Sequence, residues 1–297
     1  LAQPKCFGVF GSLYQLFIIM GICLNNILGA FVNWKILLII CAIINILFGF
    51  FLLLKHDSPV SLKLQKHKVR TKSCCSSFSC IIFDKKAKSF GLNKSYIKLV
   101  ISSMVMFFFQ QYGGINAILN KLSSIMALSG LDINPNLQSA LATLAQFVAC
   151  LIASFLMDSI GARILWIVSS IGCLLSLVVY AYCIYNTESL MNVPKFIPVL
   201  SVFVYCLFFG LGQGPAPWVV FPGNFPDFLR YEGIAMMMFS HWFISFVVCY
   251  THPIIIEKIG EFYAILIYVI CLVGSLFYGI FCIPKKESEY KEDFAMF

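Results

Sequence analysis

Long apolar segments follow one another along almost the whole chain. Each contains about 20 residues, the length that an α-helix needs to cross the hydrocarbon core of a bilayer. The connections between them are short, except for one at residues 55–96. The pattern therefore predicts eight membrane-spanning helices: 7–31, 35–54, 97–120, 137–157, 164–185, 196–221, 234–256 and 262–283.

Composition supports a membrane protein. Hydrophobic residues make up 60% of the chain and charged residues 11%, whereas soluble domains contain roughly 25% charged residues. Extended disorder, a secreted disulfide scaffold and a nucleic-acid-binding domain are excluded as descriptions of the whole chain. We therefore expect an all-α, polytopic membrane helical bundle, with the lipid bilayer as a partner and no nucleic acid.

The basic residues are distributed unevenly between the two sides of the predicted membrane. Because successive connections alternate between sides, 17 of the 21 Lys and Arg residues fall on the side of both termini and of the long loop. The four on the other side are Lys35, Lys121, Lys195 and Lys258. Basic residues favour the cytosolic side, so we expect both termini and residues 55–96 in the cytosol.

Polar amides interrupt the third predicted span, which reads FFFQQYGGINAILNK from Phe107. The amides are Gln110, Gln111, Asn116 and Asn120. Gly113 and Gly114 should loosen the helix between them. Since amides both donate and accept hydrogen bonds, they suit a neutral polyhydroxylated ligand. Hydrogen bonding between helices is the alternative that stays open.

The sixth predicted span contains GLGQGPAPWVVFPG from Gly210. Two prolines close to three glycines predict a helix that is broken in mid-membrane. Such breaks are tolerated where they line a cavity or are covered by neighbouring helices. Trp218 follows directly, and an aromatic face beside amides is a common way to hold a sugar ring. The alternative is an ordinary kink with a lipid-facing tryptophan.

These motifs resemble those of the sugar porters of the major facilitator superfamily. QQYGGIN is similar to the family's QQ-x-S-G-I-N segment in helix seven, and GQGPAPW to its GPGPIPW segment in helix ten. In the first span, GSLYQL with Gln15 resembles G-T-L-H-Q-L. DSIGAR, from Asp158 to Arg163, resembles the cytosolic [DE]-R-x-G-R-R loop, and Arg230 stands where the family has an Arg. The resemblance covers nearly the whole chain and implies the major facilitator fold.

The resemblance also implies a set of residues that contact a hexose-like sugar. They are Gln15, Gln110, Gln111, Asn116, Gln146, Phe209, Gly214 and Trp218. Gln146 takes the place of a sugar-binding Asn, and Gly214 would let unwound backbone approach the sugar. Asp158, Arg163 and Arg230 would form a cytosolic gate.

Several positions depart from the family pattern. The tyrosine pair that closes over the sugar is replaced by Asn120 and Lys121. His241 replaces an Asn, and we expect a hydrogen-bonded core histidine there in preference to a proton-carrying one. Two arginines of the loop motif are Ser159 and Ala162.

The organisation predicted from these features is the C-terminal two thirds of a transporter. Residues 1–54 would be the last two helices of an N-terminal half, and 55–96 a basic cytosolic loop with short helices. Residues 97–283 would be the six-helix C-terminal half, and 284–297 a short cytosolic tail. We expect four further helices upstream of Leu1.

The implied function is passage of a hexose-like sugar by alternating access, as a facilitator or a proton symporter, in the plasma membrane. Other interpretations stay open: transport of another small polar solute, a non-transporting sugar sensor, and a non-functional remnant. No H-E-x-x-H, P-loop or G-x-S-x-G motif occurs, so we expect neither an enzyme nor a bound metal or cofactor.

Overall fold

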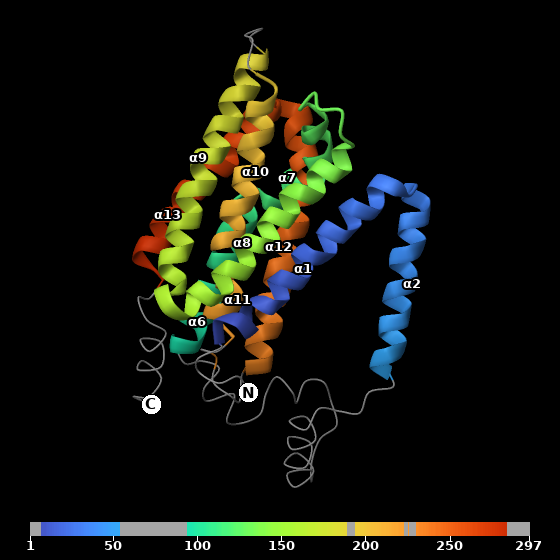
Figure 1. Ribbon diagram of the computed structural model, residues 1–297. Helices are drawn as coiled ribbons and strands as arrows, with labels where there is room; N and C mark the ends of the chain where they lie inside the picture. The colour runs from blue at the N-terminus through green and yellow to red at the C-terminus, as the bar shows by residue number, and fades with distance from the viewer. Residues whose placement is uncertain (1–6, 54–93, 189–193, 223–224, 226–229, 284–297) are drawn as a thin grey trace. The chain divides into compact units, whose positions relative to one another are not determined.

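The computed structural model describes residues 7–53, 94–188, 194–222, 225 and 230–283 (Figure 1). Every regular element in these ranges is an α-helix. The predicted short helices of residues 55–96 and the tail 284–297 lie outside the described residues, apart from the start of one helix at Lys94.

The helices reproduce the predicted spans. The first two spans are α1 (Phe7–Phe31) and α2 (Trp34–Leu53). The third span is divided into α6 (Lys94–Tyr112) and α7 (Ile115–Ala127), and the sixth into α10 (Phe196–Leu211) and α11 (Ala216–Val220). The remaining helices are α8 (Pro135–Ile160), α9 (Ala162–Glu188), α12 (Arg230–Ile259) and α13 (Glu261–Phe281).

Length and apolar composition make this an integral, multi-pass membrane protein. Seven helical segments among the described residues are long and apolar enough to cross a membrane. The third predicted span is not one of the seven, and it is interrupted at Gly113–Gly114. The break in the sixth span does not remove it from the set, because residues 196–220 remain apolar throughout.

Backbone geometry explains the break between α6 and α7. Gly114 has a φ of +93°, a left-handed conformation that other residues adopt only with strain. A Cβ at this position would also lie 2.9 Å from the ring of Tyr268. The prediction that the two glycines interrupt this helix is therefore confirmed.

Close backbone packing explains the break between α10 and α11. A Cβ on Gly212 would stand 2.1 Å from the carbonyl oxygen of Leu165 on α9, so only glycine fits. Pro215 then begins a new turn and has no N–H to continue the ladder. The predicted break in this span is confirmed.

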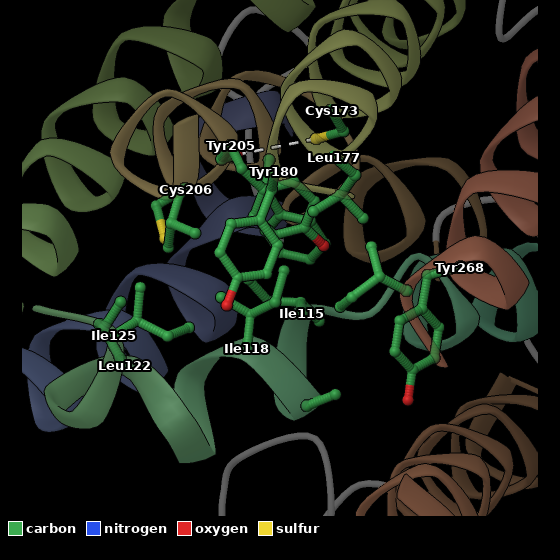
Figure 2. Packing of buried hydrophobic residues seen from close by; sticks show 14 of the residues in the cluster. Ile115, Ile118, Leu122, Ile125, Cys173, Leu177, Tyr180, Tyr205, Cys206 and Tyr268 are labelled. Atoms are coloured by element: carbon green, nitrogen blue, oxygen red, sulfur yellow. Dashed lines mark hydrogen bonds between the residues drawn. The ribbon is translucent and has the colours of Figure 1, made fainter. Parts of the chain in front are cut away.

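The contacts divide the chain into two units, residues 1–30 with 94–297, and residues 31–93. In the first unit, α9 packs along α10 and α13, and α10 also packs along α8. Apolar side chains of α7, α9, α10 and α13 form its core (Figure 2). Lipid tails are as apolar as these side chains, so close packing and hydrogen bonds between helices hold such a bundle together. In the second unit, the membrane-length segment of α2 buries none of its residues.

Candidate functional site

Two adjacent amides end α6, one turn before the break. Gln110 is 1% exposed, and its Nε2 donates to the carbonyl oxygens of Gln213 (2.8 Å) and Gly214 (2.9 Å). These carbonyls belong to the segment between α10 and α11, where no helix continues to bond them. Gln110, near the end of α6, therefore supplies hydrogen bonds to backbone carbonyls that the break between α10 and α11 leaves without helical partners. In a membrane, where no water can bond them, such groups need a partner within the protein.

Gln111 continues this network towards α7 and α12. Its Nε2 donates to Oε1 of Gln110 (3.3 Å) and to Nδ1 of His241 (3.1 Å). Its Oε1 accepts from Nδ2 of Asn116, which also donates to Oγ of Ser245 (2.8 Å). Because an amide nitrogen has only donors, His241 accepts at Nδ1 and is neutral. The expectation of a hydrogen-bonded core histidine is confirmed.

Aromatic rings lie beside the amides. Trp218 on α11 is 4% exposed, and its ring centroid lies 4.3 Å from that of Tyr14 on α1 and 4.9 Å from that of Phe107 on α6. The ring of His241 is 5.0 Å away. Nε1 of Trp218 donates to Oε1 of Gln15 at 3.1 Å. A lipid-facing tryptophan, the alternative interpretation of this span, is therefore wrong.

Gly214 connects the amides to the apolar core. Its N–H donates to the carbonyl of Phe209 (2.9 Å), and its own carbonyl accepts from Gln110. A Cβ here would meet the Phe209 ring at 3.2 Å and the Gln15 side chain at 3.5 Å. Phe209 itself belongs to the core cluster and is 2% exposed.

Gln146 on α8 stands apart from this network. It is 1% exposed, and its Oε1 has no hydrogen-bond partner among the described residues. Seven of the eight residues predicted to contact the sugar are thus linked to one another, either by a direct contact or through one intervening residue. Gln146 is the exception.

Sequence reasoning missed Gln213, which is fully buried between the two glycines of the break. Its Nε2 donates to Oγ of Ser170 (3.0 Å) and Ser275 (2.9 Å), and its N–H donates to Oγ of Ser169 (2.9 Å). These bonds fasten the break to α9 and α13. An amide inside an apolar span was a signal in the sequence, but single serines gave no hint of the partners.

The predicted gate residues make separate contacts. Asp158 accepts from the N–H of Gly8 (2.8 Å), so it bonds the first turn of α1. Arg163 donates to the carbonyl of Ile280 in the last turn of α13, where a cation is favourable. Arg230 begins α12, and its side chain lies outside the described residues.

One ion pair occurs in the part of the chain that the structure describes. Nζ of Lys121 lies 3.6 Å from Oε2 of Glu261, and both side chains are about one-third exposed. The hydroxyl of Tyr180 donates to the other carboxylate oxygen at 3.3 Å. The pair joins the middle of α7 to the first residue of α13.

An apolar bundle with two broken helices, whose breaks share a buried amide network, is typical of membrane transporters. The model of the sugar (and other) transporter family matches residues 1–295, so the chain belongs to this family. The predicted resemblance to sugar porters is thereby confirmed, and the family is one of transporters, not enzymes.

Individual relatives agree with this assignment. The facilitated trehalose transporter Tret1 of Bombyx mori is 24% identical, and the match covers 99% of this chain and 62% of that protein. Tret1 of Apis mellifera ligustica is 26% identical, over 98% of this chain and 62% of that protein. The chain thus spans about 62% of the length of these curated relatives.

Solved structures share the fold. The proton:xylose symporter XylE bound to 6-bromo-6-deoxy-D-glucose superposes with a TM-score of 0.71 at 19% identity, over 96% of this chain and 66% of that one. A partially occluded inward open conformation of XylE from E. coli gives a TM-score of 0.69 at 20% identity, over 96% and 65%. The major facilitator fold predicted from the motifs is confirmed.

Proposed function

We propose that this protein carries a neutral, hexose-like sugar across the membrane by alternating access. The observation that supports the proposal most is the buried amide network beside the Trp218 ring. Membership of the sugar (and other) transporter family and relatives named as trehalose transporters and a xylose symporter support a sugar as the substrate class.

The hydrogen-bond chemistry of the network favours a neutral polyol. Both amide hydrogens of Gln110, Gln111 and Asn116 are used within the protein. A sugar hydroxyl both donates and accepts, so it can replace an amide–amide bond without leaving either partner unsatisfied. The groups of the network carry no formal charge to attract an ion. The rings of Trp218 and Phe107 lie buried beside the amides, and the proposal places the apolar face of the sugar against the Trp218 ring.

The two breaks supply the moving parts. α7 begins after Gly113–Gly114, and α11 begins after the break at 212–215, so each can turn without bending a continuous helix. Gln110 joins the two breaks by direct hydrogen bonds. If the network is arranged differently in the outward and inward states, a sugar that binds one arrangement more tightly than the other shifts the balance between those states.

Two amide substitutions test the site. We expect Gln111→Ala and Asn116→Ala to raise the Kd of glucose about 3- to 10-fold, because a lost neutral hydrogen bond costs about 0.5–1.5 kcal/mol. The measurement is equilibrium binding to the purified protein in lipid nanodiscs, normalised to the folded fraction. A separate measurement of sugar uptake, with and without an imposed pH gradient, distinguishes facilitated passage from proton symport.

Gln138→Ala is the matched control. Gln138 is a buried amide at the start of α8, bonded through Nε2 to the carbonyl of Ile133 (2.9 Å), outside the network. It should leave the Kd unchanged. If Gln111→Ala and Asn116→Ala instead lower the folded amount and leave the Kd of the surviving protein unchanged, the amides only join helices and the proposed site is wrong.

A further inference from the structure

Two asparagines at the start of α8 are hydrogen-bonded to the end of α1. Nδ2 of Asn136 donates to the carbonyl of Gly29 at 2.7 Å, and Nδ2 of Asn134 donates to the carbonyl of Ala30 at 3.2 Å. These carbonyls belong to the last turn of α1, where a helix leaves its C=O groups without partners of its own. The start of α8 therefore supplies partners that α1 itself lacks.

The other end of each amide is also used. Oδ1 of Asn134 accepts from the N–H of Asn136 (2.9 Å) and so caps α8. Oδ1 of Asn136 accepts from Oγ of Ser123 on α7 at 2.7 Å. α7 is the helix that carries Asn116 of the amide network. The single side chain of Asn136 thus joins three helices, α1, α7 and α8.

The middle of the contact between α1 and α8 is apolar. Leu16 and Ile19 of α1 form a small buried cluster with Cys150 of α8, and Leu13 and Phe147 pack against it. Apolar contact is not directional, so it tolerates a change in the angle between two helices. Hydrogen bonds need a narrow range of distances and angles. The bonds at the ends of the two helices are therefore the contacts that such a change would break.

The opposite end of this contact is hydrogen-bonded too. There the N–H of Gly8 in the first turn of α1 donates to Asp158 near the end of α8 at 2.8 Å. The predicted organisation assigns α1 to an N-terminal half and α8 to a C-terminal half. Alternating access rocks two such halves against each other, so their contact opens at one end at a time. Opening at the end away from Asp158 requires that the bonds of Asn134 and Asn136 to α1 break.

We propose that Asn136 is a positioning residue that closes this end of the contact between α1 and α8 and couples its closure to the position of α7. A shift of α7 on sugar binding at Asn116 reaches Asn136 through Ser123 and strengthens its bond to Gly29. This inference rests on the proposed function above, and it adds the residue through which the sugar controls the opening.

Cys23 provides a natural reporter of opening. It is 7% exposed on α1, and its Sγ donates to the carbonyl of Ala140 on α8 at 3.6 Å. It lies six residues before Gly29, about 9 Å along the helix at 1.5 Å per residue. Separation of α1 from the start of α8 should therefore expose its thiol. The rate at which a maleimide labels Cys23 in lipid nanodiscs, read by mass spectrometry, measures the open fraction.

Substitutions of Asn136 test the closure. Asn136→Ala should raise the labelling rate of Cys23 about 3- to 10-fold, as expected for the loss of a neutral hydrogen bond. Asn136→Asp keeps the acceptor for Ser123 and loses the donor to Gly29, so it should raise the rate as well. A carboxylate in the first turn of a helix is favourable, so this variant should fold.

Gln138→Ala is the matched control. Gln138 is a buried amide in the same turn of α8, but its Nε2 bonds the carbonyl of Ile133 and not α1. It should leave the labelling rate of Cys23 unchanged. A rate that stays at the parent's value in both Asn136 variants, or that rises equally in Gln138→Ala, would show that Asn136 does not close this contact, and the proposed function would stand.

The coupling to the sugar is tested on the same thiol. Saturating glucose should slow the labelling of Cys23 in the parent about twofold or more. Ser123→Ala should remove most of this protection while glucose still binds, because the link from α7 to Asn136 is lost. If glucose binds without protecting Cys23, or if Ser123→Ala keeps the protection, the coupling is wrong and the proposed function stands. If glucose does not bind to the parent, the proposed function fails and this inference with it.

Discussion

At the scale of single residues, Trp218 joins more of the site than any one amide does. Its ring touches Tyr14 and Phe107, and its N–H bonds Gln15, so one side chain of α11 holds α1 and α6 together. The same ring is the apolar surface proposed for the sugar. Trp218 should therefore affect both binding and the movement of α11.

Substituting Trp218 separates these effects. Trp218→Ala removes the ring and should lower kcat and raise KM for sugar uptake together. Trp218→Phe keeps an aromatic ring but loses part of the ring surface and the bond to Gln15, so KM should rise no more than about 10-fold with kcat nearly kept. Trp34→Ala on α2, where the side chain is 65% exposed, is the control that should change neither. Equal loss from both Trp218 variants would contradict the role assigned to the ring.

At the scale of elements, the two interrupted helices show what the sequence could predict. Glycine and proline act through the backbone, so Gly113–Gly114 and the 212–217 segment predicted both breaks directly. The partners were not predictable. Gln110 reaches the carbonyl of Gln213 and Gln213 reaches Ser275, residues 103 and 62 positions apart, and only the packing of the helices brings them together.

The break before α7 gives a prediction with a close control. Gly114→Ala would require a left-handed conformation, which costs about 1–2 kcal/mol, and would place a methyl group 2.9 Å from Tyr268. Gly130→Ala meets the same backbone cost at φ +71°, but its nearest neighbour is 3.7 Å away. Thermal unfolding in detergent should show a larger loss of Tm for Gly114→Ala. Equal losses would mean that Tyr268 does not constrain the break.

At the scale of the whole molecule, apolar length predicted the spans well, because the bilayer sets one length for every crossing. α1 has the predicted bounds, and α8, α9 and α12 extend beyond theirs by two to four residues. The side of the membrane on which each connection lies is a different question. The orientation is predicted only from the distribution of basic residues, because 17 of the 21 Lys and Arg residues fall on one side.

Two exposed positions test this orientation. Ser159 ends α8 on the predicted cytosolic side, and Asp132 precedes α8 on the opposite side. In intact cells, a membrane-impermeant maleimide should label Asp132→Cys and should label Ser159→Cys only after permeabilisation, with the parent protein as the background. The reverse pattern would overturn the topology.

The central claim, that the amide network is the site of sugar transport, is tested most directly by counterflow. The protein would be reconstituted in vesicles preloaded with unlabelled sugar. We predict transient accumulation of labelled glucose or trehalose with saturable kinetics, a half-saturation about 3- to 10-fold higher for Gln111→Ala, and an unchanged value for Gln138→Ala. Absence of saturable counterflow, or a Gln111→Ala variant with the half-saturation of the parent, would contradict the account.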